Sequence, residues 1–174
     1  RRTPLIIFYL ENEGLITREF LDQHGVDTSD IIWNGVGEDV DTLEQGWEQV
    51  RQHLLKIKSF PESERIPSLI IVDSLSALQS GEEKESAIGE SKSQGKHARV
   101  NSEALRRIMP LVKTTKSILV TIFQSKADMG YGKYNAQTGL GINPINFHGG
   151  VVYSVSRTEW VKKGEKTVGL MAKI

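Results

Sequence analysis

The chain has 174 residues, the length of one ordinary domain, and apolar residues make up 38% of it, enough for a packed core. It has no cysteine, which excludes a disulfide framework, a cysteine-ligated metal site and a cysteine nucleophile. No apolar run approaches the roughly 20 residues that a membrane span needs, and no signal-peptide pattern opens the chain. We therefore expect a soluble cytoplasmic domain.

The net charge is zero, but the charges are unevenly distributed. Residues 1–90 hold 18 Asp and Glu against 8 Lys and Arg, a net of −10, whereas residues 91–174 hold 4 against 14, a net of +10. A basic half indicates an anionic partner, with nucleic acid as the first candidate. Neutralisation of one half by the other, across the fold or between subunits, explains the same numbers. Charge alone leaves both interpretations open.

Hydrophobic patterns predict alternating strands and helices in the first half of the chain. Residues 4–10 form a continuous apolar run, typical of a strand buried on both faces. Thr17 can cap a short helix that ends at Gly25, and a second strand follows near residues 30–33. An amphipathic helix comes next, with a capping box at Thr42 and Gln45 and apolar positions at Leu43, Trp47, Val50, Leu54 and Ile57.

The second half continues the alternation. Residues 68–73 form another buried strand, which ends in an acid, and the polar residues 79–97 predict a mobile loop. A helix starts near Ala98 and runs to Pro110, which should end or kink it. The remaining segments are a fourth buried strand at 117–123, a glycine-rich stretch at 125–150, and strand-like runs at 151–156, 158–162 and 167–173.

Strand–helix alternation with unbroken apolar strands predicts an α/β fold with a mainly parallel central sheet flanked by helices. In such sheets ligands bind beyond the carboxyl ends of the strands. The polar residues that follow the strands should therefore converge on one crevice. They are Glu11, Glu13, Asp73, Ser74 and Gln124.

An apolar strand that ends in Asp, here LIIVDS, is typical of the magnesium-orienting acid of phosphate-binding ATPases. A carboxylate such as Glu13 can polarise a water for attack on a terminal phosphate, and Gln124 can report that phosphate to a loop. Acids at strand ends also simply begin solvated loops. The phosphate-cradling motif G-x-x-x-x-G-K-[ST] is not found, because His97 and Tyr134 stand where it needs Ser or Thr. The abrupt start before a core strand indicates a fragment cut downstream of that loop.

Two segments of the basic half suit nucleic acid. Arg99, Ser102 and Arg106 share one helix face that fits phosphate oxygens, although a solvated face has the same pattern. Lys126 and Lys133 lie among glycines and tyrosines, a composition that suits single strands but also occurs in loops without function. The four histidines show no metal-ligand spacing, and we interpret His53 as structural. Leu105, Ile108 and Val112 occupy another face of the same helix and suit the core.

Taken together, these segments resemble the ATPase core of the RecA recombinase family. IIVDSLSAL resembles its magnesium-binding strand, and AIGESKSQGKHARVNSEALRRI resembles its first DNA-binding loop and the helix that follows. LVTIFQSK resembles the strand that ends in the phosphate-sensing glutamine, and GINPINFHGGVVYSV the end of the second DNA-binding loop. Order and spacing agree over nearly the whole chain, with about one inserted residue near 90–97. The resemblance implies a RecA-like P-loop ATPase core over residues 1–174, without the phosphate-binding loop upstream and with a C-terminal antiparallel extension.

The resemblance also implies site residues. Glu13 falls on the water-activating glutamate, Gln124 on the switch glutamine, and Asp73 on the acid that holds Mg²⁺, through water. Ser74 follows that acid beside the nucleotide, and Lys173 falls near a lysine offered to the neighbouring subunit's ATP. The DNA-contacting positions are Arg99, Ser102, Arg106, Lys126, Lys133 and Asn143.

Some residues depart from the family pattern. FYLENEG replaces the usual F-I-D-A-E, so that Glu11 can be confused with Glu13. Phe123 replaces a polar residue before the glutamine, and Pro110 is typical of phage-type members. These differences indicate a divergent, phage-type homologue.

The function implied is that of an ATP- and Mg²⁺-dependent recombinase, active in a bacterial or phage-infected cell and not at a membrane. It would form filaments on single-stranded DNA and exchange strands with a homologous duplex, while ATP acts through Gln124 to order residues 125–148 against DNA. A ring-forming helicase motor of the same superfamily, or a non-catalytic DNA-binding or filament-interface module, are the alternatives. The fragment itself is expected to be inactive.

Overall fold

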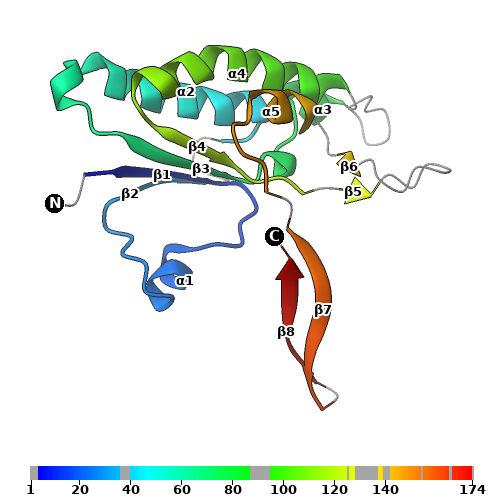
Figure 1. Ribbon diagram of the computed structural model, residues 1–174. Helices are drawn as coiled ribbons and strands as arrows, with labels where there is room; N and C mark the ends of the chain where they lie inside the picture. The colour runs from blue at the N-terminus through cyan, green and yellow to red at the C-terminus, as the bar shows by residue number, and fades with distance from the viewer. Residues whose placement is uncertain are drawn as a thin grey trace.

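A parallel sheet forms the body of the protein, as predicted. The computed structural model describes residues 4–35, 40–86, 95–124, 126–127, 137–138, 142–153, 155–164 and 166–173. Four strands pair in the order β2-β1-β3-β4, every pair parallel (Figure 1). Their bounds are β1 Ile6–Glu11, β2 Ile31–Gly35, β3 Ser68–Asp73 and β4 Ile118–Thr121.

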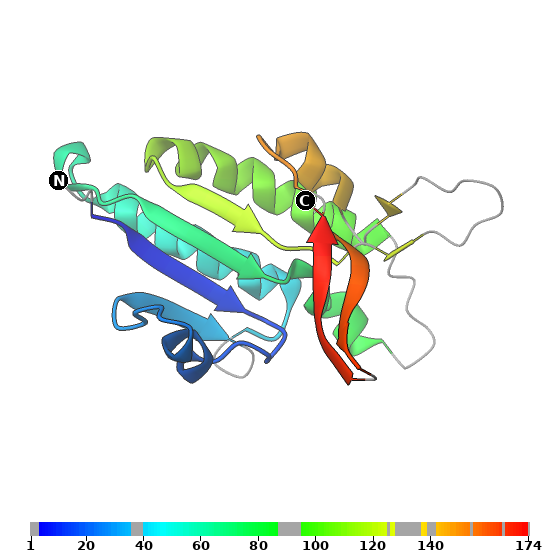
Figure 2. The same ribbon diagram turned by 60° about the horizontal axis from the view of Figure 1, so that its bottom comes forward.

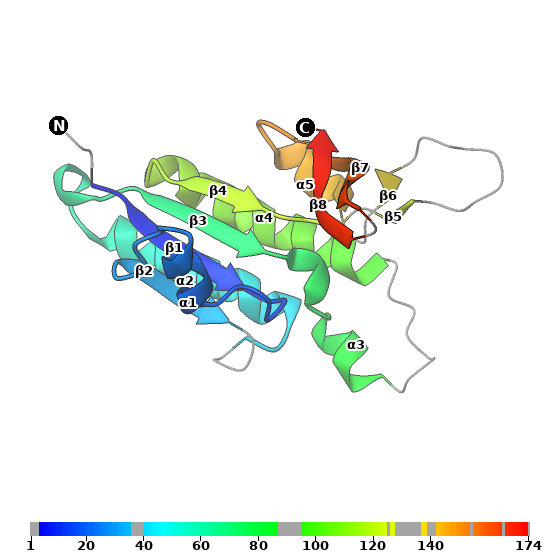
Figure 3. The same ribbon diagram turned by 90° about the horizontal axis from the view of Figure 1, so that it is seen from below.

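Helices lie on both faces of this sheet. Helices α2 (Leu43–Ser59) and α4 (Lys96–Thr114) run side by side over one face, and the short helix α1 (Arg18–Gln23) lies on the other (Figures 1 and 3). Because side chains alternate along a strand, β1 and β3 bury every second residue under α2 and α4 and present the rest to the opposite face. The core under the two helices includes Leu10, Ile70, Val72, Leu54 and Ile108.

Local hydrogen bonds explain where the helices begin. Thr42 accepts from the backbone N–H of Gln45, whose side chain accepts in return from Thr42 N–H, so the predicted capping box is confirmed. Thr17 caps α1 by accepting from Phe20 N–H at 3.1 Å, also as predicted. Inside the core, Trp47 Nε1 donates to Asn101 Oδ1 at 2.8 Å. This buried bond holds α2 against α4.

The end of α4 differs from the prediction. The helix does not end at Pro110 but continues to Thr114. Proline removes the hydrogen bond to the carbonyl of Arg106, four residues earlier, but both residues are exposed and water can reach that carbonyl. The extra turn buries Leu111 and Val112 in the core. Packing therefore outweighs the lost hydrogen bond.

The fourth strand is not buried on both faces, which corrects a second prediction. Among the described residues β4 lies at the edge of the sheet, and its side chains alternate between exposed and half-buried. Leu119 packs against the core, whereas Ile118 and Val120 are 59% and 39% exposed. An apolar run alone does not distinguish a central strand from an edge strand.

The segment predicted as a mobile loop contains a helix. α3 (Gly81–Glu85) begins at Ser80, which forms a capping box with Glu83, and α4 starts at Lys96; residues 87–94 lie outside the described part. Two 3₁₀ turns complete this region, η1 (Glu62–Glu64) and η2 (Leu75–Ala77).

Towards the C-terminus, a strand-like run is predicted at 151–156. Its described residues before Ser156 form no strand. A hairpin follows, formed by β7 (Ser156–Lys163) and β8 (Lys166–Lys173), which projects from the sheet (Figure 2). It is the predicted antiparallel extension. The single strand β7 stands where the sequence indicated two strands, at 151–156 and 158–162. Within the glycine-rich stretch the described elements are β5 (Lys126–Ala127), β6 (Gln137–Thr138) and α5 (Ile142–His148). No helix among the described residues is both long and apolar enough to span a bilayer.

Candidate functional site

The ends of β1, β3 and β4 bring three polar side chains into contact, as the strand pattern predicts. Glu13 Oε1 accepts hydrogen bonds from Ser74 Oγ at 2.6 Å and from Gln124 Nε2 at 2.9 Å. Ser74 and Gln124 lie 61 and 111 positions after Glu13 in the chain, yet both bind the same carboxylate oxygen. We call Glu13, Ser74 and Gln124 the strand-end cluster.

Ser76, in η2, links the members of this cluster. Its Oγ lies 2.9 Å from Ser74 Oγ and accepts from the backbone N–H of Gln124 at 3.2 Å. Ser76 therefore connects the backbone of Gln124 to the hydroxyl of Ser74. The sequence analysis did not single out Ser76. The one local indication of its role is its position two residues after Ser74, in the turn that follows β3.

Glu11 and Glu13 have different environments, which separates the two candidates. Glu11 is buried, and its carboxylate accepts from the backbone N–H groups of Glu13, Gly14 and Leu15 at 3.2, 2.8 and 3.1 Å. It thereby closes a turn in which Gly14 has a φ of +69°, a conformation that favours glycine. Glu11 builds the turn, and Glu13 is the carboxylate that faces the cluster.

Asp73 ends β3 beside the strand-end cluster. Its Oδ2 accepts from Tyr9 Oη at 2.9 Å, and its peptide bond to Ser74 is cis. Burial, the hydrogen bond to Asp73 and its negative charge raise the pKa of the Tyr9 hydroxyl, so that Tyr9 stays a neutral donor. Within the part of the chain that the structure describes, Asp73 Oδ1 accepts no hydrogen bond. That oxygen is free to hold a water or a hydrated cation.

Asn12 lies between the two glutamates and is buried. Its amide nitrogen donates weakly to the Ser74 carbonyl at 3.5 Å, while its Oδ1 has no partner within the described residues. A buried acceptor that a water or a ligand can satisfy therefore lies next to the strand-end cluster.

The candidate DNA-contacting residues of α4 share one face of that helix. Arg99 and Arg106 are exposed, Ser102 is half-buried, and Arg106 Nε donates to the Ser102 carbonyl at 3.3 Å. The predicted core positions Leu105, Ile108 and Val112 are buried on the other side.

The remaining candidates lie on other elements or outside the described residues. Lys126 and Asn143 fall on β5 and α5, and Lys133 lies outside the described residues. Lys173 is exposed at the end of β8 and, in the described part of the chain, forms no hydrogen bond or ion pair with the cluster. His53 is structural, as predicted: it stacks on Phe8 and its Nε2 lies 2.8 Å from Ser68 Oγ.

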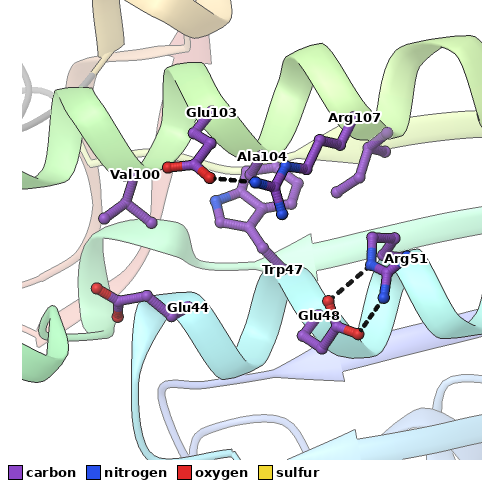
Figure 4. A pocket seen from close by; sticks show the side chains of 9 residues that line it. Glu44, Trp47, Glu48, Arg51, Val100, Glu103, Ala104 and Arg107 are labelled. Atoms are coloured by element: carbon purple, nitrogen blue, oxygen red, sulfur yellow. Dashed lines mark hydrogen bonds and ion pairs between the residues drawn. The ribbon is translucent and has the colours of Figure 1, made fainter.

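A groove between α2 and α4 is separate from these residues (Figure 4). Trp47 lies at its floor, and four of its five charged side chains pair within their own helix, Arg51 with Glu48 on α2 and Arg107 with Glu103 on α4. None of the candidate site residues lines it. Metal-ligand clusters of three or more His, Asp or Glu are absent among the described residues.

The carboxyl ends of this parallel sheet bring together Asp73, Glu13 and Gln124. Proteins with an open parallel α/β sheet bind their ligands at this end of the strands. Comparison with known proteins narrows that class. The family model of the RecA N-terminal domain matches residues 5–174. Protein RecA of Ectopseudomonas oleovorans is 31% identical over 168 residues, which cover 96% of this chain and 47% of that protein.

The chain therefore belongs to the RecA family. It spans about half the length of the curated relative it matches. At 31% identity the two sequences have diverged considerably.

Proposed function

We propose that this chain is the ATPase core of a DNA recombinase that forms filaments on single-stranded DNA and exchanges strands with a homologous duplex. The observation that carries the proposal is the shared hydrogen bonding of Glu13 with Ser74 and Gln124 at the strand ends. Membership of the RecA family supports it. The phosphate-binding loop would come from residues upstream of the core.

In the proposed reaction Glu13 acts as general base. Its carboxylate accepts a proton from water as the water oxygen bonds to the terminal phosphorus, and the bond from that phosphorus to the ADP oxygen breaks. Asp73 would hold Mg²⁺ through water with its free oxygen, and the ion when bound neutralises phosphate charge. Lys173 would reach the nucleotide of a neighbouring subunit, which places ATP between two copies of the chain.

Gln124 would act as the switch. Its amide donates to Glu13 at 2.9 Å. A terminal phosphate carries more negative charge than the Glu13 carboxylate and would draw the amide away. Because Gln124 directly precedes the stretch 125–148, this change would order that stretch, with Lys126, Lys133 and Asn143, against DNA.

The second proposed DNA contact is the α4 face of Arg99, Ser102 and Arg106. A recombinase must accept any sequence, so these side chains would bind phosphates and leave the bases free to pair. The uneven charge of the chain supports this assignment, since α4 opens the half that carries +10.

The test is a salt series of single-strand binding by the full-length protein. Arg106→Ala should lower the log–log slope by roughly 0.7, with a similar loss of affinity for every sequence. Arg107→Ala is the matched control, because Arg107 is the next residue and already pairs with Glu103 at 2.6 Å. Equal slopes for wild type and Arg106→Ala would remove Arg106 from the DNA face. Translocation by a ring, without strand exchange, would favour a helicase motor.

A further inference from the structure

The short helix α3 is fixed against the first turn of α4 by a buried contact. His97 Nε2 lies 2.6 Å from Glu83 Oε2, and their side chains are only 4% and 10% exposed. The same carboxylate oxygen accepts from the backbone N–H and the hydroxyl of Ser80. Burial alone would raise the pKa of Glu83. The hydrogen bonds from Ser80 and His97, together with the electrostatic attraction of His97, outweigh burial and lower the pKa.

Contacts with the start of α2 and with Asp41 just before it also hold α3. Gly81 N–H donates to Glu44 Oε2 at 3.0 Å, and Lys84 pairs with Asp41 at 3.1 Å. The residue before the helix cap, Gln79, accepts from the backbone of Leu43 at 2.9 Å. Helix α3 is thus tied to α2 through its Gly81 backbone and to α4 through the Glu83 side chain.

This anchoring holds the carboxylate of Glu82 near Lys96 and Arg99, the two cations in the first turn of α4. Lys96 Nζ lies 3.0 Å from Glu82 Oε2. The hydrogen bond from Lys96, its charge and the charge of Arg99 lower the pKa of Glu82, so the carboxylate remains ionised at neutral pH. Lys96 and Arg99 are three residues apart and lie on one side of the helix. Glu82 therefore faces both cations.

We propose that Lys96 is a further phosphate-binding residue of the DNA face, and that Glu82 competes with DNA phosphate for it. The carboxylate takes the place of a phosphate oxygen beside Lys96 and Arg99, and DNA must displace it. This inference rests on the proposed function, because it assumes that the α4 face binds DNA.

One observation favours exchange over a permanent pair, and a second keeps the two side chains opposite each other. The Glu82 and Lys96 side chains are 62% and 29% exposed, and exposed ion pairs are weak. Unlike most such pairs, however, this one has its backbone positions fixed by the buried His97–Glu83 contact. Glu82 therefore stays opposite Lys96 in the free protein yet can yield to the higher charge of a phosphate.

The test compares Glu82→Gln with Glu85→Gln in the full-length protein, using mixed-sequence single strands. Both changes remove one negative charge from α3, but only Glu82 contacts Lys96. Glu82→Gln should bind about three-fold more tightly than Glu85→Gln, the range of an exposed ion pair. Lys96→Gln should weaken binding and lower the salt slope by roughly 0.7.

The combination of Glu82→Gln with Lys96→Gln decides between competition and a general charge effect. If Glu82 acts through Lys96, most of the gain from Glu82→Gln disappears in the Lys96→Gln background. Equal affinities of Glu82→Gln and Glu85→Gln, or a gain that persists in full without Lys96, would overturn the inference. If Arg106→Ala still weakens binding in that case, the proposed function stands; if it does not, both fail.

Discussion

Two neighbouring glutamates at the end of β1 should have different roles: Glu11→Gln should lower the stability of the fold, and Glu13→Gln should lower activity. Glu11→Gln replaces one of two accepting oxygens by an NH₂ group. If the amide oxygen takes the Oε1 position, it keeps the bonds from Glu13 and Leu15, while the NH₂ group faces the N–H of Gly14. A buried hydrogen bond to a charged group is lost, and a loss of about 2–3 kcal/mol in the free energy of unfolding is expected. For a domain of this size the Tm should fall by roughly 5–10 °C.

Glu13→Gln is the matched control, since it makes the same chemical change two residues away. Both hydrogen bonds of Glu13 end on Oε1, and an amide oxygen in that position keeps them. Its unfolding free energy should stay within about 0.5 kcal/mol of wild type. Urea denaturation followed by tryptophan fluorescence measures both variants. Equal stability of Glu11→Gln and wild type, or a larger loss in Glu13→Gln, would refute the assignment of Glu11 to the turn.

Three further predictions concern the fold and the chain by itself. Burial, with a smaller contribution from a nearby lysine, lowers the pKa of His53 from 6.5 to about 4, so the unfolded chain binds the proton first and stability falls as the pH drops from 6.5 towards 4. Since the ring is only half-buried, the loss should be on the order of 1–2 kcal/mol in urea titrations, and His53→Gln should flatten it; parallel curves for the two proteins would show that His53 is not responsible. Asn101→Ala leaves the indole N–H of Trp47 buried without its acceptor and should cost about 1–3 kcal/mol in the same assay, more than Asn34→Ala, which removes a half-buried hydrogen bond to Gln49; equal losses would contradict this account of the α2–α4 contact. The 174-residue chain alone should not hydrolyse ATP, because its sequence contains no phosphate-loop motif; phosphate release that Asp73→Ala abolishes would show otherwise.

Much of the fold follows from local patterns in the sequence. The runs at 4–10 and 68–73 become neighbouring central strands, and the capping box at Thr42 starts α2 where expected. The convergence of Glu13, Ser74 and Gln124 follows from the rule that parallel strands end at one edge.

The features that sequence reasoning missed depend on tertiary contacts. Nothing local shows that Pro110 faces solvent while the next two residues are buried, which lets α4 continue. The edge position of β4 depends on which strands flank it, and apolar content does not report that. The pairing of His97 with Glu83 joins residues 14 positions apart, within the stretch that the sequence predicted as a mobile loop, and no local pattern relates them.

The most direct test of the central claim is ATP hydrolysis by the full-length protein with and without single-stranded DNA, in wild type and Glu13→Gln. If Glu13 activates the attacking water, Glu13→Gln loses DNA-stimulated hydrolysis but keeps ATP-dependent binding to single strands, because the hydrogen bonds to Ser74 and Gln124 remain. Hydrolysis by Glu13→Gln at the wild-type rate in the presence of DNA would contradict the account.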